Sequence, residues 1–209
     1  MATTNYGWNL PSVGGDQDTW GDELNAAIGE IDAQMATNQA APGRLLSAGV
    51  SSVAAVTIAL SADQEIYRLD LVNTDPAIDA QKLGLQFSVD GGITYLSGSS
   101  DYSYAGSVIT AAAAETAFGD DANDRIVLTP NNMTNSSGFC QRFTVNIFAI
   151  SGQNTVIDWR GWVIQASSLA NQLIHGAGRM ASAAKPTHVR VLFPSGNVAR
   201  CTYNVAARG

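Results

Sequence analysis

The chain has 209 residues, enough for one globular domain with its own hydrophobic core and an appendage, but not for two large domains. Only 14% of the residues are charged, a composition that suits β-rich proteins better than helical bundles. The net charge of −7 is concentrated in residues 1–43, which contain six acidic and no basic side chains, so contact of this region with nucleic acid or an anionic membrane is disfavoured.

The first 18 residues are predicted to form an extended docking segment. Glycines and Pro11 break any helical or strand period there, while apolar side chains alternate at Tyr6, Trp8 and Leu10. Apolar side chains without a core of their own favour insertion into a partner surface, and a frayed terminus is the alternative. The segment lacks the basic region and continuous apolar run of a secretory leader, so export by that route is not expected.

A short helix is predicted to begin near Thr19, because Thr19-Trp20-Gly21-Asp22 has the form of a capping box. Trp20 is assigned to the docking surface together with the three apolar residues before it. Within this helix the apolar residues are spaced 4, 3 and 4 apart, which is the pattern of a coiled-coil heptad: Leu24, Ile28, Ile31 and Met35. Isoleucine at both kinds of heptad position favours association of three copies. A single amphipathic helix lying on the rest of the protein is the alternative.

A small-residue linker is predicted after the helix, at residues 38–43. The uncharged stretch from Leu45 to Ala62 is about long enough for a membrane span, but four serines, a threonine and a glycine make it weakly hydrophobic. We therefore expect a linker that runs into a strand, and no membrane span.

From there on the hydrophobic period changes to two, which is typical of half-buried strands. Residues 44–209 are therefore expected to form one all-β domain, an antiparallel β-sandwich or jelly roll. Short helical turns are predicted at Ala111–Ala117 and Ser167–Ile174, and a surface loop at Gly176–Thr187. The predicted strands lie at residues 67–71, 83–89, 143–147, 155–164, 189–193 and 199–205, with turns at residues 90–92, 151–154 and 194–197.

No catalytic, metal or cofactor site is predicted. His175 and His188 are the only histidines, and they are expected to be a solvated loop residue and a polar residue at a strand start. Neither a nucleophile elbow nor a phosphate-binding loop is present in the sequence. Cys140 and Cys201 are expected to be two reduced thiols, with a bridge between neighbouring strands as the alternative.

Two acidic turns are assigned a structural role. Gly119–Asp124 gathers carboxylates that suit calcium, but it lacks the residue order of the known calcium loops, so a solvated acidic turn is expected. Ser88–Tyr95 resembles an Asp-box, the hairpin of sialidase-type propellers, which is a folding element remote from the active site of those families. A single copy does not make a propeller, and we expect Asp90 to cap the turn.

Aromatic side chains are the best candidates for ligand contacts. Tyr102, Tyr104 and Trp162 are the candidate glycan-binding residues, because aromatic rings stack on sugars. Trp159 and Trp162 have opposite parity along one strand, so one is expected in the core and the other on an outer face. For each aromatic residue, packing in the core or between subunits is the alternative role.

Several short motifs of the sequence are similar to those of a known protein family. Thr3–Trp8, Pro11–Asp16 and Thr19–Asn25 closely resemble the N-terminal leader of phage tail-fibre and head-fibre proteins. In that family the leader attaches a trimeric fibre to the particle. A looser similarity to small fibre-tip domains is found at residues 83–92, 97–102, 159–161 and 191–198, while residues 111–138 follow no such pattern.

The resemblance implies a structural virion protein of a phage-like particle, without enzymatic activity and assembled in the bacterial cytoplasm. Residues 1–43 would dock on capsid, portal-proximal or fibre subunits as a homotrimer, and residues 44–209 would project. Because long repetitive shafts are missing, a short head spike, fibre base or decoration protein of a phage or gene transfer agent is favoured. The alternative is a tail-fibre or spike module that recognises host surface polysaccharide; a depolymerising enzyme rests only on scattered carboxylates.

Overall fold

The structure is a computed structural model that describes residues 28–31, 45–136 and 138–208. The chain divides into two units, Met1–Arg44 and Leu45–Gly209. In the first unit residues 28–31 are helical, and the side chain of Ile31 is 52% exposed. The other predicted docking and seam residues lie outside the described residues: Tyr6, Trp8, Leu10, Trp20, Leu24 and Met35.

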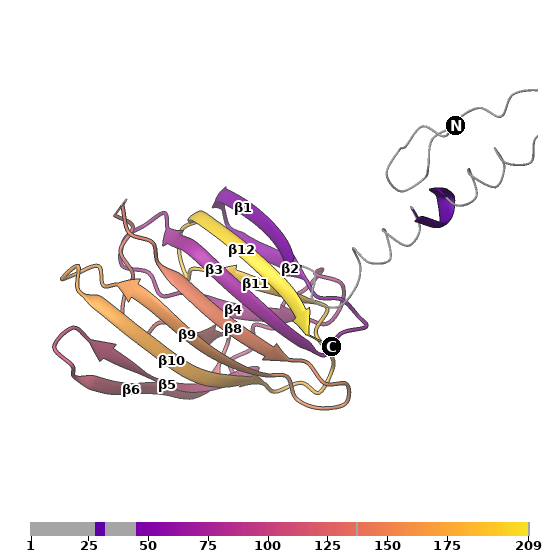
Figure 1. Ribbon diagram of the computed structural model, residues 1–209. Coiled ribbons are helices and arrows are strands. Elements are labelled where there is room, and N and C mark those ends of the chain that lie inside the picture. Colours follow the sequence, from indigo (N-terminus) through magenta and orange to yellow (C-terminus); the bar gives the residue numbers. More distant parts are fainter. Residues whose placement is uncertain (1–27, 32–44, 137, 209) are drawn as a thin grey trace, which may run out of the picture. The chain divides into compact units, whose positions relative to one another are not determined.

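The second unit is a β-sandwich of two antiparallel sheets, which confirms the predicted fold class (Figure 1). In spatial order, the eight-stranded sheet contains β1 (Leu45–Val53), β12 (Val198–Arg208), β3 (Ile66–Pro76), β8 (Arg142–Phe148), β9 (Val156–Ile164), β10 (Asn171–Met180), β5 (Tyr102–Thr110) and β6 (Glu115–Asn123). The four-stranded sheet contains β2 (Ala55–Ala59), β11 (His188–Leu192), β4 (Gly84–Ser88) and β7 (Ile126–Val127).

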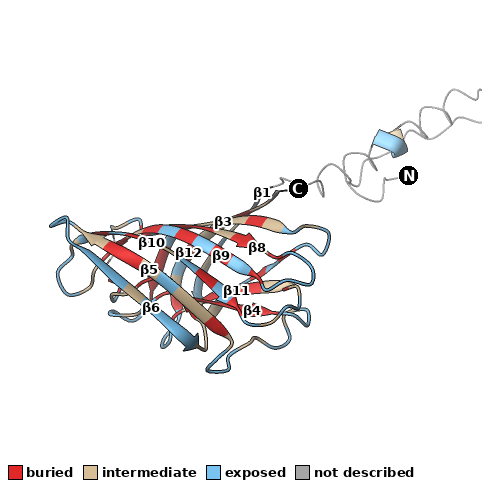
Figure 2. Cartoon of the chain, turned by 90° about the horizontal axis from the view of Figure 1, so that it is seen from below, coloured by how far each residue is buried: buried red, intermediate tan, exposed pale blue. Residues whose placement is uncertain are grey.

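Alternation of apolar and polar residues positions the core between the sheets. In β3, Tyr67, Leu69 and Leu71 are buried, while Arg68 and Asp70 between them face outward and are only half-buried. The same alternation appears as changing colours along the strands in Figure 2. The six strands predicted from this period are confirmed as β3, β4, β8, β9, β11 and β12.

Cross-strand pairs of glycine and an aromatic residue shape the inner face of the large sheet. A Cβ atom added at Gly176 would lie 2.4 Å from the Trp159 ring, and one at Gly161 would lie close to the Phe143 ring. Both glycines are directly opposite these aromatic residues in the sheet register. The glycines therefore leave the space into which large rings pack, and the rings cover backbone that would otherwise be exposed.

Three local predictions are wrong, and their residues lie in strands or turns. Gly176–Met180 belongs to β10 and only residues 181–187 form a connection, because the glycines that suggested a loop make room for the side chains of Trp159 and Ile126. The stretch 111–117 is a turn followed by β6. The stretch 167–174 is a turn, closed by a hydrogen bond from the Leu169 N–H to the Gln165 carbonyl, followed by β10. The strand expected within residues 45–62 is confirmed: β1 already begins at Leu45, and β2 follows it.

The predicted turns are confirmed by their backbone conformation. Gly91, Gly92, Gly152 and Gly196 all have positive φ values, which glycine adopts without steric cost. Cys140 is exposed and Cys201 is buried, and both are free thiols. Burial raises the pKa of the Cys201 thiol, which keeps it protonated at neutral pH.

The Asp-box-like hairpin is held by the carboxylate of Asp90. Its oxygens accept hydrogen bonds from the Thr94 hydroxyl (2.5 Å), the Ser88 hydroxyl (2.7 Å) and the Thr94 N–H (2.9 Å). Because all these donors favour the ionised form, they hold the pKa of Asp90 well below its ordinary value of 3.8. Asp90 therefore caps the turn, as predicted.

Asp90 is expected to make the folding stability of the protein depend on pH in the acidic range. A depressed folded-state pKa contributes stability above the unfolded-state pKa, and this contribution is lost as the pH falls below about 4. The difference in thermal midpoint between the native protein and Asp90→Asn should therefore be constant near neutral pH and shrink below about pH 4. Asp121→Asn is the control, because within the described residues the Asp121 side chain makes no hydrogen bond. An unchanged Asp90→Asn difference down to about pH 2 would contradict the capping role.

A buried carboxylate ties the end of β3 to two distant segments. Asp75 is 1% exposed and accepts hydrogen bonds from Arg200 Nε (2.9 Å) and Gln141 Nε2 (3.0 Å). The amide of Gln141 also donates to the Thr134 carbonyl and accepts from the Ile164 N–H. This network fixes the irregular chain before β8 against the sandwich.

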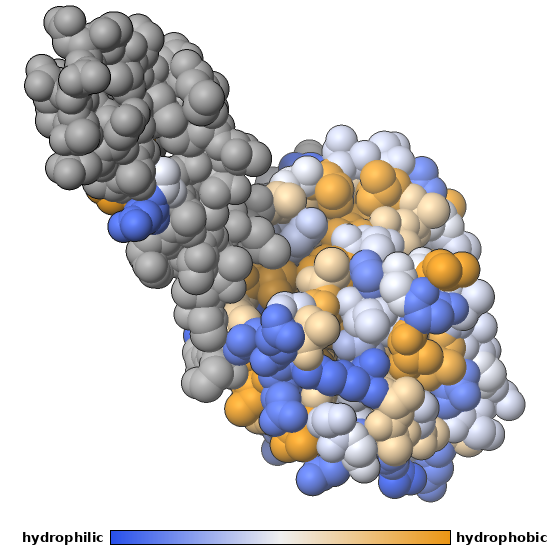
Figure 3. All heavy atoms as spheres, turned by 90° about the vertical axis from the view of Figure 1, so that its right-hand side faces the viewer, coloured by the Kyte–Doolittle hydropathy of each residue, from blue (hydrophilic) through white to orange (hydrophobic). Residues whose placement is uncertain are grey.

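The β-sandwich begins and ends at the same edge of the large sheet. Leu45, the first residue of β1, is paired with Ala206 near the end of β12. Hydrophilic and hydrophobic residues are interspersed on the face of residues 45–208 that Figure 3 shows. Among the described residues there is no helix long and apolar enough to cross a membrane.

Candidate functional site: a polar groove on the large sheet

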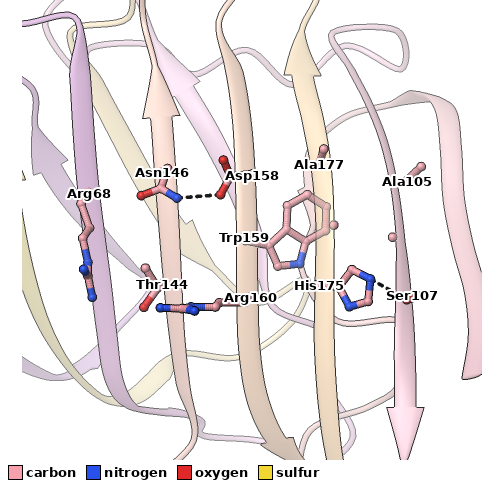
Figure 4. Close-up of a pocket in the computed structure, with 12 residues that line it drawn as sticks. Arg68, Ala105, Ser107, Thr144, Asn146, Asp158, Trp159, Arg160, His175 and Ala177 are labelled. Carbon is pink, nitrogen blue, oxygen red and sulfur yellow. Dashed lines mark hydrogen bonds between the residues drawn. The ribbon is translucent and has the colours of Figure 1, made fainter.

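The strand register places polar side chains in a row on the outer face of the large sheet. Thr144 on β8 is opposite Arg160 on β9, which is opposite His175 on β10. His175 in turn is opposite Ser107 on β5. Alternation puts all four side chains on the face that points away from the core, where Figure 4 shows His175 reaching Ser107.

A hollow of about 840 Å³ lies over this row. Its floor is low because β10 and β5 carry small residues there, at Gly176, Ala177, Ala105 and Gly106. Polar side chains surround the floor, and the buried ring of Trp159 lies beneath Gly176. The remaining lining residues are Arg68, Ser107, Thr144, Asn146, Asp158, Arg160 and His175 (Figure 4).

A second hollow of about 230 Å³ adjoins the first and shares Thr144 and Arg160 with it. Here the half-buried ring of Trp162 lies between Arg142 on β8 and Leu173 on β10, its direct partners in the sheet. We call the two hollows together the outer-face groove. It combines one accessible aromatic ring with several hydrogen-bonding groups, the usual composition of a small polar binding site.

Some charged side chains of the groove form ion pairs, and others do not. Asp70, at its edge, is bound by the guanidinium of Arg68, with Nε 3.0 Å from Oδ2, and by the Thr144 hydroxyl at 2.7 Å. Partial burial raises the pKa of Asp70, but the hydrogen bonds from Thr144 and Arg68 outweigh it and the net pKa is lowered. Within the described part of the chain, Arg142 and Arg160 belong to none of the three ion pairs. Both side chains are exposed, and the charge of Arg142 also helps to lower the pKa of Asp70. Within the described residues, neither guanidinium is thus held in an ion pair.

Ser107, His175 and Glu115 form a hydrogen-bonded cluster at one end of the groove. The Ser107 hydroxyl donates to Glu115 Oε1 (2.6 Å), and His175 Nε2 lies 3.0 Å from the same hydroxyl oxygen. A hydroxyl has one proton, and here the carboxylate accepts it, so His175 acts as a donor to Ser107. In this arrangement Glu115, and not His175, accepts the proton of Ser107, as a general base would. His175 holds the hydroxyl from the other side.

The structure separates the three predicted glycan-binding residues. Tyr102 is only 1% exposed, and its hydroxyl accepts a hydrogen bond from the Phe87 N–H, so its ring belongs to the core and cannot stack on a ligand. Tyr104 is half-buried and packs against Phe118. Trp162 lies in the groove, whereas Trp159 is buried, which confirms the predicted division between the two tryptophans.

Other candidate residues have structural partners. The prediction of His175 as a loop residue is wrong, because it lies within β10. His188 begins β11, as expected. Asp120 is part of β6 and accepts a hydrogen bond from Asn123 Nδ2 (2.8 Å), so the predicted acidic turn is largely strand. Among the described residues, no three His, Cys, Asp or Glu side chains gather as a metal site.

Sequence reasoning missed most residues of the groove. Asn146, Arg142 and Thr144 occupy the polar positions of a strand whose apolar residues had been recognised, so their parity already indicated an outer face. β8, β9 and β10 are consecutive in the sequence and pair in that order, whereas β3 and β5 join them over long sequence separations that the composition does not reveal. From the sequence alone, Arg160 can be predicted to hydrogen-bond sugar hydroxyls, because it neighbours Trp159 and Trp162.

Comparison with known proteins adds no relatives to this description. The chain matches no family model and no curated protein. The arguments for its function are therefore the pattern of its sequence and the geometry of its groove.

Proposed function

We propose that the chain is a non-enzymatic structural subunit of a phage-like particle, a short head spike, fibre or fibre base. Residues 1–43 dock on other particle proteins, their helix associates three copies, and the β-sandwich projects as an adhesive module. The aromatic and acidic composition of residues 1–43 supports docking on a neutral or basic protein surface.

The position of the chain entry into the sandwich carries the proposal. Because Leu45 is paired with Ala206, the chain enters and leaves the β-sandwich side by side. In the strand order of the large sheet β1 is at one edge, whereas β8, β9 and β10 lie in its interior.

Exchange of the docking side chains tests this function in the full chain. Tyr6→Ser, Trp8→Ser and Leu10→Ser together should abolish incorporation into particles, because they remove the apolar anchors, while the melting of the β-sandwich stays unchanged. Incorporation is measured by immunoblotting of purified particles. Trp162→Ala, in the groove, is the control and should be incorporated normally. Normal incorporation of the triple variant would refute docking through this segment.

A second candidate function is recognition of host surface polysaccharide by the projecting module. The observation that favours it is the ring of Trp162, which lies in a hollow between a guanidinium and an aliphatic side chain on an outer sheet face. Aromatic rings in such positions offer an apolar surface to a sugar ring, while neighbouring polar groups fix the hydroxyls.

A further inference from the structure

We infer that the outer-face groove binds an acidic polysaccharide, with a sugar carboxylate held between Arg142 and Arg160 and a sugar ring against Trp162. This inference rests on the second candidate function and adds to it the chemical class of the ligand and the residues that select it.

The position of the two arginines carries the charge selectivity. Arg142 is the direct cross-strand partner of Trp162, and Arg160 precedes Trp162 by two residues on the same face. Arg142 and Arg160 are thus diagonal neighbours, about 7–8 Å apart at their Cα atoms. Two arginine side chains at this separation reach one carboxylate, which a guanidinium binds through paired hydrogen bonds.

The charge of the groove differs from that of the whole protein. In the larger hollow Arg68 is neutralised by Asp70, and Asp158 and Glu115 lie in or beside it. The smaller hollow around Trp162 is lined by Arg142 and Arg160 and by no carboxylate, whereas the chain has a net charge of −7. Asp158 also accepts a hydrogen bond from Asn146 Nδ2 at 2.6 Å (Figure 4). A locally cationic hollow around Trp162 favours an anionic ligand there over a neutral one.

The shape and polarity of the groove favour a polysaccharide over an acidic polypeptide. The groove lies on the face of the sheet, where the strands already pair with each other, so an added peptide strand finds no free backbone partners. Its floor offers small side chains at Ala105 and Ala177 rather than apolar pockets for peptide side chains. Hydroxyl, amide and imidazole groups line the walls and match the hydroxyls of a sugar chain.

Calorimetry with the full chain tests the inference, using short alginate oligosaccharides as the acidic probe. Neutral maltooligosaccharides and oligoglutamate of matching length are the comparison ligands. Alginate is expected to bind, more weakly as salt is added, and Arg142→Gln, Arg160→Gln and Trp162→Ala should each weaken binding by about 10- to 100-fold. Arg179→Gln is the matched control, since Arg179 lies on the same face outside the groove.

Each other outcome decides against the inference. Equal binding of oligoglutamate would assign the groove to an acidic protein partner. An equal loss with Arg179→Gln would show unspecific charge attraction, and absence of alginate binding would remove the site. Particle incorporation of the same groove variants is measured in parallel: if they are incorporated normally but alginate does not bind, the inference fails while the structural function stands.

Discussion

Trp159→Ala is expected to destabilise the β-sandwich by about 3–5 kcal/mol, because it leaves a cavity in the core. The ring packs over Gly176 and lies 6.5 Å, centroid to centroid, from the ring of Phe118. Its Nε1–H also donates to the Leu128 carbonyl at 3.1 Å, and that carbonyl would lose its partner. Chemical denaturation followed by circular dichroism measures the change.

Trp162→Ala provides the matched control for this prediction. Trp162 lies three residues further along the same strand but faces the groove. Its replacement by alanine should therefore lower the free energy of unfolding by about 1 kcal/mol or less. If the two variants lost equal stability, the assignment of the two rings to opposite faces would be wrong. The pair also separates the roles of the tryptophans, since only Trp162 is expected to affect ligand binding.

Arg200→Met is expected to lower the free energy of unfolding by about 3 kcal/mol. The Arg200 side chain is half exposed, but its partner Asp75 is almost completely buried, so the substitution leaves a buried carboxylate with Gln141 as its remaining side-chain donor. Asp75→Asn in the Arg200→Met background should restore much of this stability, because an amide needs no counterion.

The surface pair of Arg68 and Asp70 provides the control for the buried pair. Both side chains are partly exposed to water, and Arg68→Met should therefore cost less than about 1 kcal/mol. The measurement is again denaturant unfolding. A larger loss for Arg68→Met than for Arg200→Met, or no recovery in the double variant, would contradict the proposed importance of the buried carboxylate.

The all-β class could be predicted from the sequence because period-two alternation is a local property. It is clear in stretches such as Tyr67–Leu71 and Phe143–Ile147, where bulky apolar residues define the inner face. It fails in β10, whose Gly176 and Gly178 contribute no side chains to the pattern. Their role depends on Trp159 and Ile126, which approach from elsewhere in the sequence.

The groove could be predicted only in part for the same reason. The opposite parity of the two tryptophans follows from one strand alone, and the structure confirms it. The contact between Ser107 and His175 joins residues 68 positions apart, and it requires β10 to lie between β9 and β5. The prediction of Tyr102 as a surface residue is wrong, because it lies on the face of β5 that the core covers. The identity of the residue alone does not indicate on which face of the strand it lies.

If residues 1–43 attach the chain to a particle while the β-sandwich projects with its groove exposed, a cryo-EM map of intact particles should show three copies of the sandwich at each attachment point. The edge formed by β1 and β12 should lie nearest the tether, and the outer faces of β8, β9 and β10 should be open to solvent. Particles without this density, or with the outer-face groove covered by a particle protein, would contradict this arrangement.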